Sequence, residues 1–108
     1  MAIAKLTAKD FDQALETHSL LLIDFWAEWC GPCKAFGKIM STLSDDYPDI
    51  FFASVNVEIE KDLAEEFAVR SIPFVMIIKN RTVVYAESGV LSAPALRELL
   101  DQAKALTT

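Results

Sequence analysis

Two cysteines, Cys30 and Cys33, are the only ones in this chain of 108 residues. A disulfide between residues so close in sequence closes almost no loop, so it would add little to the stability of the fold. Small secreted proteins that rely on disulfides spread their cysteines along the chain instead. A thiolate, however, attacks disulfides, and a closely spaced pair can alternate between dithiol and disulfide. The spacing therefore favours dithiol–disulfide exchange.

A structural or metal-binding pair of cysteines is the alternative interpretation. Zinc sites normally have four ligands, and besides the two cysteines this chain offers only a lone His18, which is far off in the loop before the strand at 20–26. The pattern therefore favours redox chemistry, and we expect neither a metal nor another cofactor.

The residues around the cysteines suit a transition from a buried strand to an amphipathic helix. Residues 29–34 read Trp-Cys-Gly-Pro-Cys-Lys. At a helix start, unpaired N–H groups and the helix dipole stabilise a thiolate. Residues three apart on a helix lie about 5–6 Å apart at Cβ, close enough for a disulfide. We expect Cys30, at the exposed tip, to attack a partner's disulfide, and Cys33, one turn inward, to resolve the mixed disulfide.

Hydrophobic periodicity predicts the elements that hold this segment. Leu20–Trp26 is a continuous apolar run broken only by Asp24, which is typical of a buried strand. An apolar helix face follows Cys30 and is expected to extend to Tyr47, where Pro48 ends the helix. Four further strands are predicted at 3–6, 50–57, 74–78 and 82–87. Three further helices are predicted: one is capped by Thr7, one contains Leu63 to Phe67, and one is capped by Ser92. This order predicts an α/β protein with a mixed sheet.

The composition indicates a single domain and argues against some classes of partner. The chain is 53% hydrophobic and 24% charged, which suits one core and a single domain over residues 1–108. The net charge of −6 and the lack of a basic cluster argue against nucleic acid and against anionic membrane surfaces. No apolar run approaches the ~20 residues that span a bilayer. The start of the chain shows no secretory leader, so we expect a cytoplasmic location.

The segment from Asp24 to Lys34 closely resembles the active-site segment of the thioredoxin family. The resemblance extends to Arg70-Ser-Ile-Pro73, to Lys79-Asn80 and to Ser88-Gly-Val-Leu-Ser92, in the same order along the chain. It implies the thioredoxin fold, with a central mixed β-sheet flanked by helices on both faces. It also implies a protein-disulfide reductase that is recycled by a separate thioredoxin reductase, since this chain has no nucleotide-binding Gly-rich loop. We expect a monomer.

The resemblance also assigns roles to individual residues. Cys30 would be the nucleophile, Cys33 the resolving cysteine, and Asp24 a buried carboxylate that exchanges protons with Cys33. A groove for partner polypeptides would comprise Trp29, Gly31, Pro32, Ile72, Pro73, Gly89 and Val90, with Pro73 as a cis-proline facing the dithiol. Simpler interpretations remain for some of them: Asp24 could satisfy nearby backbone groups, Pro73 could be an ordinary trans residue, and Gly89 could only make a turn.

Four residues depart from the family pattern. Ser54 replaces a lysine near the buried aspartate, so Asp24 is expected to stay protonated to higher pH. Lys38 replaces a kinking proline, which predicts a straighter helix. Phe74 replaces a small polar residue, and Arg81 replaces a glycine in the hairpin turn, where a positive φ is expected.

Two other functions use the same fold. One is a binding module in which the groove holds a client and the cysteines matter little. The other is a net oxidant or isomerase, which differs from a reductase only in its redox potential.

Overall fold

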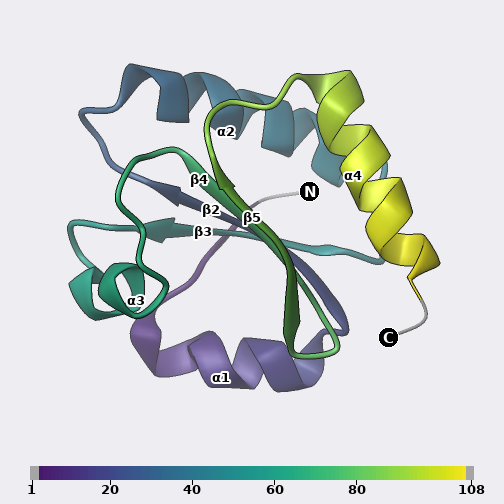
Figure 1. The fold of residues 1–108 in the computed structure, drawn as a ribbon, viewed down its shortest axis with the longest axis horizontal. Coiled ribbons are helices and arrows are strands. Elements are labelled where there is room, and N and C mark those ends of the chain that lie inside the picture. Colours follow the sequence, from purple (N-terminus) through teal and green to yellow (C-terminus); the bar gives the residue numbers. More distant parts are fainter. Residues whose placement is uncertain (1–2, 107–108) are drawn as a thin grey trace.

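The computed structural model describes residues 3–106, which form nine elements (Figure 1). They follow the predicted order β-α-β-α-β-α-β-β-α. In chain order the elements are β1 (Ala4–Lys5), α1 (Ala8–Thr17), β2 (Leu20–Trp26), α2 (Gly31–Ser44), β3 (Phe51–Asn56), α3 (Lys61–Glu66), β4 (Phe74–Lys79), β5 (Thr82–Ser88) and α4 (Ala93–Ala105).

The strands form one sheet in the order β1-β3-β2-β4-β5. Strands β1, β3 and β2 run parallel to one another, whereas β4 is antiparallel to both β2 and β5. Figure 1 shows α1 and α3 on one side of this sheet and α2 and α4 on the other. The predicted mixed sheet with helices on both faces is therefore confirmed.

Strand β2 divides its side chains between two cores, because successive residues of a strand point to opposite faces. Leu21, Ile23 and Phe25 pack in the core under α1 and α3. Leu20 and Leu22 pack in the core under α2 and α4. Asp24 continues this second row, so its carboxyl group points toward α2.

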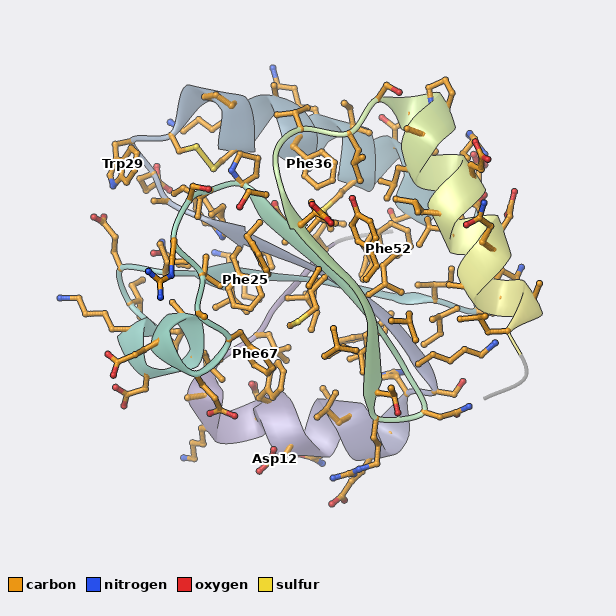
Figure 2. All side chains as sticks on the ribbon, viewed as in Figure 1. Asp12, Phe25, Trp29, Phe36, Phe52 and Phe67 are labelled. Atoms are coloured by element: carbon orange, nitrogen blue, oxygen red, sulfur yellow. A yellow bond between two sulfur atoms is a disulfide. The ribbon has the colours of Figure 1, made fainter. Side chains whose placement is uncertain are left out.

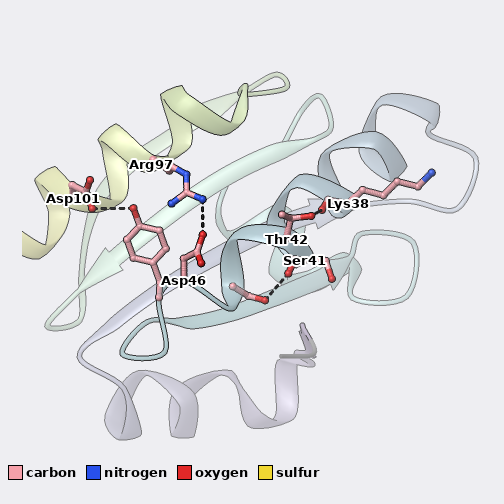
Figure 3. A network of polar contacts seen from close by, with 8 residues as sticks. Lys38, Ser41, Thr42, Asp46, Arg97 and Asp101 are labelled. Carbon is pink, nitrogen blue, oxygen red and sulfur yellow. Dashed lines mark hydrogen bonds and ion pairs between the residues drawn. The ribbon is translucent and has the colours of Figure 1, made fainter.

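Helix α2 ends earlier than the sequence predicts. It stops at Ser44, four residues before Pro48, and Tyr47 lies in the turn that follows. Tyr47 is still buried, because this turn folds back against α4 and the Tyr47 hydroxyl donates to Asp101 at 2.9 Å (Figure 3). The buried apolar residues that suggested a longer helix therefore extend beyond the end of α2. The helix runs without interruption through Lys38, and its straightness stays a prediction.

The β4–β5 hairpin turns at two residues with positive φ, Asn80 at 49° and Arg81 at 68°. The expected positive φ at Arg81 is confirmed. The turn is held in place by the Asn80 N–H, which donates to the Ser19 carbonyl at 2.8 Å. A left-handed conformation costs a residue with a side chain roughly 1–2 kcal/mol.

Arg81→Gly is therefore expected to stabilise the protein by about 0.5–1 kcal/mol, because glycine adopts this conformation freely but gains entropy in the unfolded chain. Urea unfolding measures the change. Arg81→Ala is the matched control, since it removes the same charge and keeps the Cβ. An equal gain in both variants would show that charge, and not φ, sets the effect.

Candidate active site

Cys30 is the N-cap of α2, and its sulfur makes the cap. Its backbone is extended, with φ −91° and ψ 104°, and the Cys33 N–H donates to the Cys30 Sγ at 3.2 Å. A disulfide joins the two cysteines, whose Cα atoms lie 5.2 Å apart, within the expected range. The Sγ of Cys30 therefore lies where the first N–H groups and the helix dipole favour negative charge.

The expectation that Cys30 is exposed is wrong. Its side chain is only 4% exposed, and that of Cys33 is 2% exposed. The reason is the loop before β4, which places the Ile72 carbonyl oxygen 4.0 Å from the Cys30 Sγ. The neighbouring Gly31 and Pro32 are exposed, so the disulfide lies just beneath an open surface.

The loop before β4 brings together three of the predicted groove residues. The Ile72–Pro73 peptide bond is cis, as the resemblance implied. The Gly89 N–H donates to the Pro73 carbonyl at 2.8 Å, which attaches the end of β5 to this loop. Gly89 has φ 115°, a conformation that favours glycine, so it both makes a turn and lies beside Pro73. The next residue, Val90, is 47% exposed.

Trp29 is 69% exposed, and its ring is held by a residue that the sequence analysis missed. Its indole N–H donates to a carboxylate oxygen of Glu58 at 2.9 Å. Figure 2 shows Trp29 at the end of the molecule that carries the disulfide. The signal was available in the topology: β2 and β3 are parallel neighbours, so the loops after them adjoin at one edge of the sheet.

Asp24 is buried, with 3% of its surface exposed, and its Oδ1 has no hydrogen-bond partner among residues 3–106. That oxygen therefore does not satisfy nearby backbone groups. Burial raises the pKa of the Asp24 carboxyl from 3.8 to about 7. Ser54 pairs with Asp24 in the register of β2 and β3, as the sequence analysis assumed.

Asp24 and Cys33 line the same cavity, which has a volume of about 400 Å³. The carboxyl group of Asp24 and the buried sulfur of Cys33 thus border the same open cavity. His18 has no part in it, because its ring stacks on Phe51 at 4.0 Å. Within the part of the chain that the structure describes, no group of three or more His, Cys, Asp or Glu residues could hold a metal.

Comparisons with known proteins agree with this geometry. The model of the Thioredoxin family matches residues 2–102. Putative thioredoxin 2 of Streptomyces coelicolor is 41% identical over 102 residues, which are 94% of this chain and 76% of that protein. The chain belongs to the thioredoxin family. It is a thiol–disulfide oxidoreductase, with Cys30 and Cys33 as its pair of redox cysteines.

Other members of the thioredoxin family are similar over nearly their whole length. Thioredoxin of Buchnera aphidicola is 34% identical over 93% of this chain and 94% of that protein. The crystal structure of mitochondrial thioredoxin 3 from Saccharomyces cerevisiae, in its oxidised form, superposes with a TM-score of 0.85 and 31% identity, covering 93% of this chain and 94% of that one. A thioredoxin from Halobacterium salinarum has a TM-score of 0.89 at 24% identity, which supports the fold alone.

The raised pKa of Asp24 gives the stability of the protein a definite pH dependence. Since the folded-state pKa of about 7 exceeds the value of about 3.9 in unfolded chains, the contribution of Asp24 to stability is most favourable below about pH 4 and falls until the pH passes about 7. Asp24→Asn is expected to remove this loss and to stabilise the protein at about pH 8 by up to about 4 kcal/mol. Urea unfolding at several pH values measures it. An equal difference between variant and wild type at pH 4 and pH 8 would contradict the assignment.

Ser54→Lys tests whether residue 54 controls this pKa. An ammonium group beside Asp24 would favour the charged carboxylate, so the Asp24 pKa is expected to fall. An NMR titration of the Asp24 carboxyl carbon measures it in wild type, in Ser54→Lys and in Thr82→Lys, which adds the same charge on the edge strand β5. Superimposable curves for wild type and Ser54→Lys would show that residue 54 does not influence Asp24.

Proposed function

We propose that this protein reduces disulfides of other proteins. The observation that carries the proposal is the disulfide at the N-terminus of α2, which lies beside the Ile72–Pro73 loop and just beneath an exposed surface. The disulfide form is the product state of such a reductase. The reduced form has two thiols that can give two electrons to a partner's disulfide. The start of the helix favours the thiolate at Cys30.

The reaction has two exchange steps. The Cys30 thiolate attacks one sulfur of the partner's disulfide, which forms a mixed disulfide and releases the partner's other sulfur as a thiolate. Cys33 then loses its proton, and its thiolate attacks the Cys30 Sγ. This second step forms the Cys30–Cys33 disulfide and releases the partner's remaining thiolate, so two electrons pass from the dithiol to the partner.

Asp24 is the proposed proton acceptor for Cys33. Both residues line one cavity, and the Asp24 pKa of about 7 lies near the usual working pH. A general base is most effective when its pKa is close to that pH. A water molecule in the cavity could carry the proton between the two groups within normal hydrogen-bond distances.

Partner polypeptides are proposed to dock on the surface around the disulfide. The Cys30 Sγ lies 4.0 Å from the Ile72 carbonyl oxygen, and the Gly89 N–H donates to the Pro73 carbonyl, so half-buried Ile72 and exposed Gly89 lie next to the buried Cys30 and Pro73. The remaining predicted members of the groove are exposed around it: Trp29, Gly31, Pro32 and Val90. Large exposed apolar side chains such as Trp29 and Val90 are typical of docking surfaces.

The proposed setting follows the family. The chain would act in electron transport and redox homeostasis as a single cytoplasmic domain and a monomer, with no cofactor of its own, and a separate thioredoxin reductase would reduce it again. The formal net charge of −6 supports protein partners over nucleic acid or anionic membranes. No helix within residues 3–106 has the length and apolar character needed to cross a membrane.

The first test is the reduction of insulin disulfides by dithiothreitol, with and without catalytic amounts of protein. The wild type is expected to accelerate the reaction, and Cys30→Ser is expected to abolish the acceleration. A binding module would leave the rate unchanged in both cases. The reduction potential, measured against glutathione, separates a reductase from a net oxidant or isomerase, whose potential would be higher.

A second prediction concerns the roles of the two cysteines. Cys33→Ser is expected to accumulate mixed disulfides with a disulfide-containing protein, because no thiol remains to release the partner from Cys30. Cys30→Ser should accumulate few, since the N-cap position that favours a thiolate belongs to Cys30 and not to Cys33. Non-reducing gels followed by mass spectrometry measure both. In the reduced wild type, iodoacetamide should modify Cys30 first, and earlier modification of Cys33 would reverse the assignment.

A further inference from the structure

The cavity beside Asp24 has the features of a small-molecule site. It lies between α2 on one side and β2 and β3 on the other, and its volume is about 400 Å³, within the usual range for ligand pockets. Buried Met40 and Cys33 line it from α2, while half-buried Trp26 and Ile3 add apolar surface. A compact apolar molecule would fit this lining.

One polar atom at this cavity, Asp24 Oδ1, has no hydrogen-bond partner among the described residues. This oxygen is buried, and Ser54, the neighbour of Asp24 in the β2–β3 register, lies at the same cavity. A buried acceptor without a hydrogen bond costs free energy. A ligand that donates a hydrogen bond to this oxygen would recover that free energy, and this would favour its binding.

We propose that this cavity binds a small organic cation, with an amidinium or ammonium group on Asp24 and a compact apolar body against Trp26 and Met40. An amidinium N–H group donates a charge-assisted hydrogen bond to a carboxylate, which is stronger than a bond between neutral groups. Two lysines, Lys34 and Lys38, also line the cavity, but both are exposed. Lys34 is 3.8 Å from Glu28, and exposed charges are screened by salt far more than a buried carboxylate.

The two tryptophans allow binding to be located. Trp26 lines the cavity, whereas Trp29 lies outside it and donates to Glu58. In an NMR titration of the oxidised wild type at about pH 8, benzamidine should shift the indole signal of Trp26 saturably and leave that of Trp29 nearly unchanged. Benzamide, its neutral analogue, should bind about tenfold more weakly, because it lacks the charged hydrogen bonds.

Two variants test whether Asp24 causes the preference for benzamidine over benzamide. Asp24→Asn should bind benzamidine and benzamide equally well. Asp12→Asn removes the same charge from α1, on the opposite side of the sheet (Figure 2), and should keep the tenfold preference. The proposal is overturned if Trp26 does not respond to benzamidine, if Trp29 alone responds, or if Asp24→Asn keeps the preference.

These measurements are independent of the proposed function, because the oxidised protein performs no turnover during the titration. Turnover is measured separately with insulin in the presence of benzamidine. A cation that occupies the cavity and leaves the rate unchanged would count against the role proposed for Asp24, and it would still support the binding site.

Discussion

The Cys33 N–H donates to the Sγ of Cys30, so one sulfur atom both caps α2 and carries the redox chemistry. The rest of the site follows from this position. The helix start favours negative charge on that sulfur, and Cys33 lies within bonding distance because the first turn is already helical. The Ile72 carbonyl oxygen also lies 4.0 Å from this sulfur. A cap made by serine or threonine would satisfy the N–H group equally well and could not exchange disulfides.

Strand β2 places a carboxyl group behind this cap at considerable cost. Leu20, Leu22 and Asp24 form one row on the face of the sheet covered by α2 and α4, and only the last of them is polar. Its Oδ1 has no partner among the described residues, and burial alone raises its pKa. An apolar side chain there would pack without this loss. The proposed transfer of a proton from Cys33 would give this destabilising carboxyl group a function.

Local pattern in the sequence predicted most of the fold and part of the site. Hydrophobic periodicity is a local property, so it found the strands and the helices, while the comparison with the family pattern predicted the positive φ at Arg81. It failed where distant segments meet. The burial of Cys30 depends on a carbonyl 42 residues away, and the bond between Trp29 and Glu58 depends on two loops joined only by the topology. The early end of α2 was missed because Tyr47 stays buried outside the helix.

The hydrogen bond between Trp29 and Glu58 joins two loops at the end of the sheet that have different tasks. The loop after β2 carries the reacting sulfur, and the loop after β3 carries the charge that fixes the aromatic ring beside it. A substitution at position 58 alters how that ring is presented and leaves the cap of α2 intact. Mutation of the loop after β3 would therefore change the proposed docking surface and leave the disulfide chemistry of the other loop as it is.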